Sequence, residues 1–290
     1  MKIAIIGGTG TIGAHLLPLL AKTDAQVTAL ARTSAAAEAV RRSGATPILG
    51  DLSDGEAVKS LVGEADSLLL LTANTPGQLD QESRVIEANA SSRRALVVKV
   101  SAPGVSGDSP LAFGRTHHAA EELLRASGVD HVVIRPGWLM QNVGLVLDGI
   151  VRGGELALPI GTGAIAAVDA RDVAAACRVA LTEPARLPSG DLLVIGREDV
   201  DGAAMAEALS TAARRAITFR DATREEFEAS LRANGTHAEL VDDLAFLYDV
   251  VIRNGFVAGP DSSVEELTGA RATTFGSFAT DHSAWFTPRG

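Results

Sequence analysis

The sequence predicts a doubly wound α/β fold, in which helices cover both faces of a parallel sheet. Short apolar runs alternate with helical patterns up to about residue 150, and the first apolar run ends in a glycine-rich turn. Beyond about residue 200 this alternation gives way to mostly helical patterns. We therefore expect one large α/β domain and a smaller, mostly helical C-terminal domain.

The expected strands are short and apolar, as in strands that are buried on both faces of a parallel sheet. We place them at residues 3–6, 27–31, 47–49, 67–71, 96–100 and 131–135. Helical patterns occupy residues 12–21, 78–91 and 114–127. The segment Ser53-Asp54-Gly55-Glu56 has capping-box spacing, which predicts a further helix start.

After residue 149, glycine pairs mark loops and the pattern becomes less regular. We expect a strand at 165–168, a helix at 172–181 with Asp172 as its N-cap and Arg171 as an ion-pair partner, and a strand at 192–195. Later elements include a strand at 217–219 and two capping-box starts, Thr223 with Glu226 and Ser262 with Glu265. These features predict a nucleotide-binding domain at 1–150, rejoined by about 165–200, and a lid domain at 201–290.

Composition excludes several classes of function. The net charge of −10 argues against a general nucleic-acid binder, because phosphate contacts need clustered Lys and Arg. The single cysteine, Cys177, excludes a disulfide framework and a multi-thiolate zinc site, and we expect it to be buried; no metal site is expected. No signal-peptide pattern or membrane-length apolar run is apparent, so we expect a cytoplasmic protein without a membrane partner.

The glycine-rich turn has the spacing of a dinucleotide-binding loop. Gly7 allows a tight turn, Gly10 lets the backbone approach a pyrophosphate, and Gly13 lets helix and strand pack closely. Thr9, Thr11 and Ile12 complete the loop. An apolar strand precedes it and an amphipathic helix follows, so we favour an NAD(P)-binding Rossmann domain over a turn without a ligand.

The ends of the next strands predict which dinucleotide binds. Arg32 and Thr33 follow the second strand, where a guanidinium can hold a 2′-phosphate. NADP(H) is therefore favoured over NAD(H). The alternative is that Arg32 is only a solvent-exposed loop residue. Asp51 and Leu52 follow the third strand and are expected beside the adenine. The fourth strand is followed by a segment expected beside the pyrophosphate and ribose, Thr72-Ala73-Asn74.

Over nearly its whole length the chain resembles the NmrA-like branch of the atypical short-chain dehydrogenases/reductases. The motifs that carry the resemblance are the loop at 7–13, Val98-Lys99-Val100-Ser101-Ala102, His117 with Glu121, Ile134-Arg135-Pro136-Gly137-Trp138, Gln141-Asn142 and Val168-Asp169-Ala170-Arg171-Asp172. That branch includes NAD(P)H:quinone oxidoreductases and redox-sensing regulators. The resemblance implies a substrate cleft closed by a small C-terminal domain, with Pro136, Gly137 and Trp138 beside the nicotinamide and Gln141 and Asn142 facing the substrate.

The chain departs from conventional short-chain dehydrogenases in its catalytic pair. Those enzymes move a proton with a Tyr whose pKa is lowered by a Lys four residues later. Here the single tyrosine, Tyr248, is followed four residues later by Ile252, and no lysine occurs after Lys99. The usual couple cannot form.

Three other side chains are candidates for catalysis. Ser101 ends the fifth strand, where the resemblance implies a serine that bonds the substrate carbonyl; the alternative is a hydroxyl that caps the following loop. His117 and Glu121 share a helix face, which suits either an imidazole acid held by a carboxylate or a structural pair. Arg115 could steady a developing oxyanion but cannot relay protons.

Three functions remain open. The first is an NADPH-dependent oxidoreductase acting on a quinone or another conjugated carbonyl, with a planar substrate bound by Trp138, Met140, Phe246 and Phe256, unless these residues are ordinary core. The second is a non-catalytic NADPH/NADP+ sensor that regulates a protein partner. The third, an epimerase or dehydratase acting on a nucleotide sugar, is weakened by the missing couple. A homodimer is expected only from its general prevalence.

Overall fold

The computed structural model describes residues 1–92, 95–255 and 259–287, and the chain forms two compact units. Unit 1 comprises Met1–Pro110, Gly114–Pro136 and Ala170–Val194, and unit 2 comprises Leu111–Phe113, Gly137–Asp169 and Ile195–Gly290.

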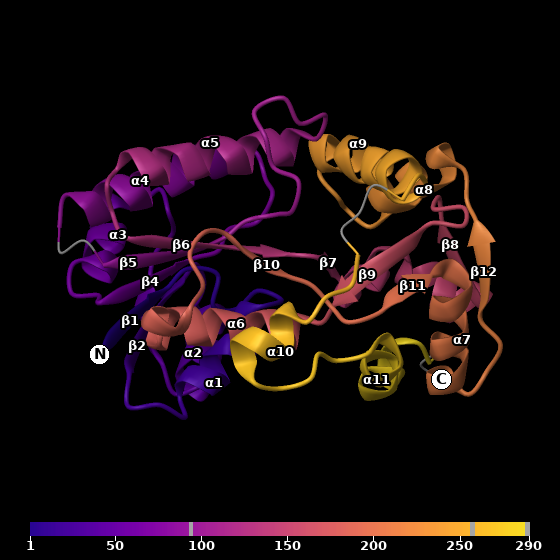
Figure 1. Ribbon diagram of the computed structural model, residues 1–290, viewed down its shortest axis with the longest axis horizontal. Helices are drawn as coiled ribbons and strands as arrows, with labels where there is room; N and C mark the ends of the chain where they lie inside the picture. Colours follow the sequence, from indigo (N-terminus) through magenta and orange to yellow (C-terminus); the bar gives the residue numbers. More distant parts are fainter. Residues whose placement is uncertain (93–94, 256–258, 288–290) are drawn as a thin grey trace. The chain divides into compact units, whose positions relative to one another are not determined.

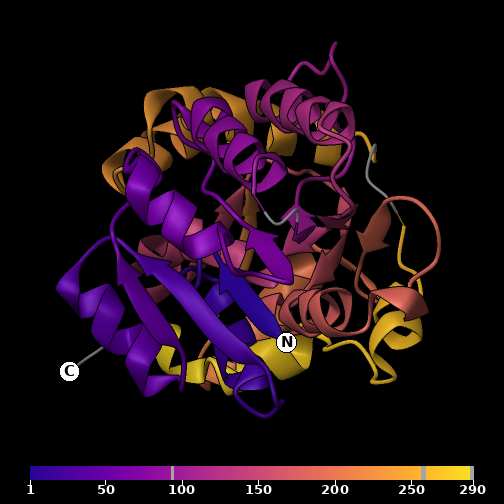
Figure 2. The ribbon, with the colours of Figure 1, turned by 90° about the vertical axis from the view of Figure 1, so that its left-hand side faces the viewer.

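Unit 1 contains a seven-stranded sheet in the order β10-β6-β5-β4-β1-β2-β3, with every neighbouring pair parallel. The strands are β1 (Lys2–Ile5), β2 (Gln26–Ala31), β3 (Thr46–Leu49), β4 (Ser67–Leu70), β5 (Leu96–Val100), β6 (His131–Pro136) and β10 (Leu192–Val194). Strands β1 to β6 belong to the indigo-to-magenta part of the ribbon, whereas β10, which comes later in the sequence, is salmon-coloured (Figure 2). The strand order reverses between β1 and β4, as in a Rossmann sheet, which confirms the predicted fold class.

Helices cover both faces of this sheet (Figure 1). Those of unit 1 are α1 (Gly13–Leu20), α2 (Ser34–Arg42), α3 (Gly55–Val62), α4 (Gln78–Ala90), α5 (Ala112–Ala126), which begins in unit 2, α6 (Ala170–Thr182) and the short η3 (Pro184–Arg186). Helices α3, α4 and α5 lie on one face, and α1, α2 and α6 on the other. Cys177 on α6 is fully buried, as expected, and burial raises the pKa of its thiol to about 12.

Four helix starts test the predicted caps. The predicted box at Thr223 and Glu226 is confirmed. At α3 the cap is Asp54, whose carboxylate accepts from the N–H groups of Glu56 and Ala57; the expected Ser53 start was one residue too early. Helix α6 begins at Ala170, which places Asp172 inside the first turn rather than at the N-cap. Ser262 does occupy the N-cap of its helix, but its hydroxyl donates to the Glu266 side chain instead of closing a box.

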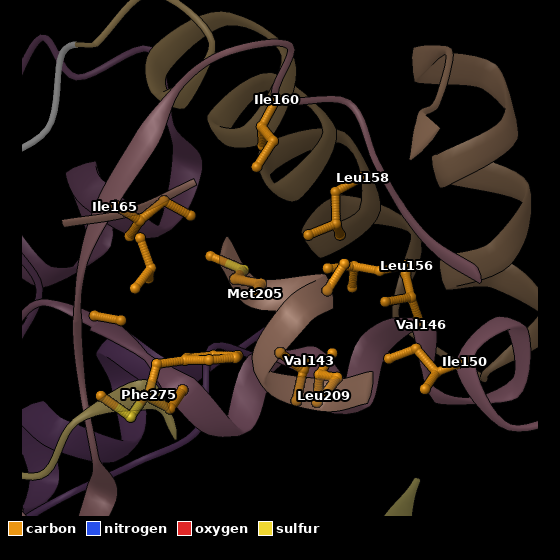
Figure 3. Close-up of a cluster of buried hydrophobic side chains, with 14 of the residues drawn as sticks. Val143, Val146, Ile150, Leu156, Leu158, Ile160, Ile165, Met205, Leu209 and Phe275 are labelled. Atoms are coloured by element: carbon orange, nitrogen blue, oxygen red, sulfur yellow. The ribbon is translucent and has the colours of Figure 1, made fainter. Parts of the chain in front are cut away.

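Unit 2 is built from short strands and helices around its own apolar core. Its strands form two small sheets, β11-β9-β7 and β12-β8. Their bounds are β7 (Trp138–Leu139), β8 (Glu155–Leu158), β9 (Ala164–Val168), β11 (Asp199–Asp201) and β12 (Thr218–Asp221). The helices are η1 (Met140–Val146), η2 (Gly149–Gly153), α7 (Gly202–Ala213), α8 (Arg224–Ala233), α9 (Ala238–Phe246), η4 (Leu247–Ile252), α10 (Ser263–Thr268), α11 (Phe275–Asp281) and η5 (Ser283–Trp285). Side chains from several of them meet in one cluster, including Val143, Ile165, Met205 and Phe275 (Figure 3).

The unit boundaries differ from the predicted domain boundaries. The chain leaves unit 1 after Pro136 rather than near residue 150, because Trp138 and Leu139 pair with β9 instead of extending the large sheet. It returns at Ala170 and leaves again after β10, whose three residues pair with β6. Unit 2 is thus assembled from separate stretches of the chain.

Candidate functional site

The turn after β1 requires glycine at two positions. Gly7 has a φ of +80°, and a Cβ on it would lie 2.4 Å from the carbonyl oxygen of Leu71. A Cβ on Gly13 would lie 2.1 Å from the carbonyl oxygen of Gly7. A side chain at Gly7 would clash with the segment after β4, and one at Gly13 would push α1 away from the turn after β1, so both glycines are required by packing.

The start of α1 offers backbone donors to an anion. Ile12 occupies the N-cap, and within residues 1–92 no side chain caps this helix and no acidic residue lies in its first turn. Thr9, Gly10 and Thr11 are exposed around it, and the Gly10 N–H donates to the carbonyl of Gly7 at 3.0 Å. An open helix N-terminus behind a glycine turn fits the phosphates of a dinucleotide.

The segment after β4 lies next to this loop. Strands β1 and β4 are neighbours at the point where the strand order reverses, which is where ligands of such sheets bind. The contact between Leu71 and Gly7 brings the following residues, Thr72, Ala73 and Asn74, towards the same edge. The predicted loop and the predicted β4 segment are therefore brought together.

Two of the predicted cofactor-binding residues, Arg32 after β2 and Asp51 after β3, interact electrostatically. Arg32 is exposed, and its charge contributes to a lowered pKa of Asp51, for which hydrogen bonds from Ser53 are the larger cause. The Thr33 hydroxyl accepts from the Ala36 N–H at 3.1 Å, so it caps α2. Leu52 packs against the apolar core beneath the loop. The exposed guanidinium beside the end of β2 fits a 2′-phosphate.

A cluster of buried polar side chains contacts Thr72 and Asn74. The Lys99 ammonium on β5 donates to Glu82 on α4 at 2.5 Å, and both side chains are 0% exposed. Thr72 and Gln78 also donate to Glu82. A buried carboxylate with an ammonium and two neutral donors is fully paired, so the cluster is rigid.

His117 joins this cluster to Asn74. Its Nδ1 lies 3.4 Å from Lys99 Nζ, and its Nε2 lies 3.0 Å from Asn74 Oδ1. Burial, and then the Lys99 charge, lower the pKa of His117 to about 4. The imidazole is neutral at physiological pH.

A second buried cluster surrounds Glu121 on α5. Its carboxylate accepts from Ser101 at 2.6 Å, from Arg135 at 2.6 Å and from Arg125 at 2.9 Å. Although burial alone would raise it, the pKa of Glu121 is lowered by the bonds from Arg135, Ser101 and Arg125. The expected pairing of His117 with Glu121 was wrong, because each side chain is engaged by other partners.

These contacts define what the catalytic candidates can do. The one hydroxyl proton of Ser101 is directed at Glu121, so Ser101 is oriented to accept a hydrogen bond rather than donate one to a carbonyl. Arg115 is exposed and donates to the carbonyl of Ser109 at 2.5 Å. Its role towards an oxyanion stays a prediction.

The remaining predicted residues, apart from buried Pro136 at the end of β6, belong to unit 2. The Trp138 indole donates to the Tyr248 hydroxyl at 2.7 Å, and the Gln141 amide donates to Asp169 at 3.1 Å. Gly137 and Asn142 are half-buried, and their contacts with cofactor and substrate stay predictions. Tyr248 is fully buried, and burial raises the pKa of its phenol far above the usual value.

The four residues expected to bind a planar substrate, Trp138, Met140, Phe246 and Phe256, do not share one environment. Met140 is fully buried in the unit 2 core, which is the alternative that the sequence left open. Phe246 and Trp138 are half-buried, and Phe256 lies outside the described residues. Only the partly exposed members can contribute to a substrate surface.

Sequence reasoning missed Lys99 and Glu82 as members of the site. The available signal was a lysine in the middle of an otherwise apolar strand, Leu96-Val97-Val98-Lys99-Val100. A charged residue at such a position is buried only when it is paired. Its partner lies 17 residues earlier on a helix, which no local pattern indicates.

Among the described residues, no group of three or more His, Cys, Asp or Glu side chains is placed to hold a metal ion. Over the same residues, no helix combines the length and apolar character needed to cross a membrane.

Comparisons with known proteins point to one kind of ligand. A family model described as NAD(P)H-binding matches residues 7–184. Over 284 residues the chain is 31% identical to NAD(P)H azoreductase of Xenophilus azovorans, covering 98% of this chain and 99% of that protein.

Two further likenesses concern a quinone reductase and a regulator. Quinone oxidoreductase 2 of Escherichia coli (strain K12) is 26% identical over 94% of this chain and 95% of its own. Its structure complexed with NADPH has a TM-score of 0.82, at 24% identity over 97% of this chain and 99% of that one. The structure of NmrA, a negative transcriptional regulator, has a TM-score of 0.75 at 14% identity, over 97% of this chain and 94% of that one, which is a likeness of fold.

Proposed function

This chain belongs to the NAD(P)H-binding family, in the NmrA-like branch of the atypical short-chain dehydrogenases/reductases, and we propose that it reduces a quinone or another conjugated acceptor with NADPH. It is an NAD(P)H-dependent oxidoreductase.

The residues around the β1 turn suit NADPH. The open α1 terminus behind Gly7 and Gly13 would hold the pyrophosphate, and Arg32 would hold the 2′-phosphate. When bound, NADPH supplies a hydride from its nicotinamide ring. Asp51 and Leu52 would border the adenine, since they follow the neighbouring strand β3.

The proposal of a conjugated acceptor rests on one observation, which is the environment of the side chains that could act as acids. Ser101 directs its proton at Glu121, His117 is neutral beside Lys99, and Tyr248 is fully buried. None of these three is set up to protonate a substrate oxygen during hydride transfer.

A conjugated acceptor tolerates this arrangement. Delocalisation stabilises the anion that forms when a hydride adds to a quinone, so a proton from water is sufficient. One quinone, one hydride from NADPH and one proton give one hydroquinone and NADP+. The names of the azoreductase and quinone oxidoreductase relatives agree with acceptors of this kind.

The second candidate is a sensor that binds NADPH without turnover. The likeness of fold to the regulator NmrA favours it, and the same lack of an acid is consistent with it. The two candidates differ in one measurable property, which is acceptor-dependent oxidation of the cofactor.

The test is a stopped or continuous assay of NADPH oxidation at 340 nm. The acceptors are a small benzoquinone, an azo dye and, as a matched control, an isolated ketone that has no conjugation. We expect oxidation of NADPH with the quinone or the dye and none with the ketone. Tight NADPH binding without oxidation by any acceptor would move the assignment to the sensor.

A further inference from the structure

The imidazole of His117 has its hydrogen-bonding roles fixed by Lys99. An ammonium is only a donor, so the Nδ1 atom that faces it at 3.4 Å must be the acceptor of a neutral ring. The proton therefore sits on Nε2, which donates to Asn74 Oδ1 at 3.0 Å. This assigns both the tautomer of His117 and the orientation of the Asn74 amide.

The lysine is itself held in place. Lys99 donates to Glu82, and both side chains are buried. Glu82 accepts further hydrogen bonds from Thr72 and Gln78. The ordered chain of contacts thus runs from α4 through β5 and α5 to the segment after β4. Asn74, at its end, is half-buried, whereas His117, Lys99 and Glu82 are buried.

The position of Asn74 identifies what it can reach. It follows Leu71, whose carbonyl contacts Gly7 in the phosphate loop, and β4 is the strand beside β1 at the reversal of strand order. With Oδ1 engaged by His117, the Nδ2 group of Asn74 is the donor that remains for a ligand. An N–H donor beside the loop suits an oxygen of the dinucleotide.

We propose that His117 is a positioning residue that fixes the carboxamide of Asn74 as a hydrogen-bond donor to the ribose–pyrophosphate part of NADPH. The inference rests on the proposed function only in that NADPH is the ligand. It does not depend on which acceptor is reduced, or on whether turnover occurs at all.

The test is a fluorescence titration with NADPH in the absence of any acceptor. The variants are Asn74→Ala, His117→Leu, His117→Gln and the double variant Asn74→Ala/His117→Leu, with His118→Leu on the same helix as the matched control. Loss of one hydrogen bond predicts about 5- to 10-fold weaker NADPH binding for Asn74→Ala and for His117→Leu. His117→Gln carries an N–H near the position of Nε2, so it should restore binding to within about 3-fold, and the double variant should be no weaker than Asn74→Ala.

Three outcomes would overturn the proposal. If His117→Gln binds as weakly as His117→Leu, or if the two losses add in the double variant, His117 does not act through Asn74. If Asn74→Ala binds NADPH normally but raises the KM of an acceptor, Asn74 serves the substrate instead.

Thermal unfolding of each variant shows whether it is folded. Should His117→Leu fail to fold, Asn74→Asp carries the test, because it keeps an oxygen for His117 but lacks the N–H donor. Its NADPH affinity should fall at least about 10-fold, and unchanged affinity would refute the assignment.

Discussion

His117 illustrates how a neighbour decides the chemistry of a side chain. An exposed histidine on a helix titrates near neutral pH and can serve as an acid. Here burial, and then the Lys99 charge, keep the ring neutral, so it is suited to orienting Asn74 rather than to donating a proton. Ser101 is a parallel case, because its hydroxyl donates its hydrogen bond to Glu121 and not to a substrate carbonyl.

The lowered pKa of His117 makes stability depend on pH. The unfolded chain binds a proton at this residue below about pH 6.5, whereas the folded protein does so only below about 4. The free energy of unfolding should therefore fall as pH decreases from 6.5 to 4, by about 3 kcal/mol from this residue alone. Urea unfolding at several pH values should show this fall in the wild type and a smaller one in His117→Gln.

The carboxylates provide the internal control for that comparison. Glu121 has a lowered pKa, so the stability it contributes is lost only as pH falls below its ordinary range near 4.5. This loss is common to both proteins and cancels in the difference. Parallel curves between pH 6.5 and 5 would show that His117 is not held neutral.

Arg32 is expected to select the cofactor. Removing a charged partner of the 2′-phosphate should weaken NADPH binding about 10- to 100-fold in Arg32→Ala and leave NADH binding unchanged. Arg41→Ala on α2 is the matched control, because Arg41 is exposed and pairs with Glu38. Equal losses for NADPH and NADH would show that Arg32 contributes only general charge.

Helices and strands differ in how well the sequence indicates them. The strands expected from the sequence were placed to within about two residues, because most of them are apolar runs bounded by polar turns, whereas β7, β8 and β11 of unit 2 were missed. Helix α2 (Ser34–Arg42) was not among the helices placed from the sequence, although Thr33, whose hydroxyl caps it, precedes an alanine-rich stretch. At α3 two adjacent residues could act as cap, and only the backbone geometry distinguishes Asp54 from Ser53.

The close packing of α1 on β1 gives a direct test of the phosphate loop. Gly13→Ala would place a methyl group 2.1 Å from the Gly7 carbonyl oxygen, and we expect it to lower the unfolding free energy by about 1–3 kcal/mol and to abolish tight NADPH binding. Gly55→Ala at the start of α3 is the control, because a Cβ there meets nothing within 4 Å. Circular dichroism melts and NADPH titration measure both effects, and normal NADPH binding by Gly13→Ala would contradict the assigned loop.

Across the whole chain, the contacts that sequence reasoning could not supply are those between distant residues. Asp243 accepts from the N–H groups of Ala112 and Phe113 at the start of α5, 131 and 130 residues earlier, and the Trp138 indole donates to Tyr248, 110 residues later. No short sequence motif indicates either of these contacts. The glycine loop and the strand ends, by contrast, are recognised because the sheet order alone brings them to one edge.

Tyr248 provides the last test, since it is the only tyrosine in the chain. It packs against Phe227 in the unit 2 core and its hydroxyl accepts from the Trp138 indole. Tyr248→Phe should lower the unfolding free energy by about 1 kcal/mol through the lost hydrogen bond. We expect kcat with a quinone to change by less than about 3-fold, whereas removal of a general acid costs about 10²–10⁴-fold. A loss of that larger size in a stable, NADPH-binding variant would show that the phenol takes part in proton transfer and that the acceptor needs an acid after all.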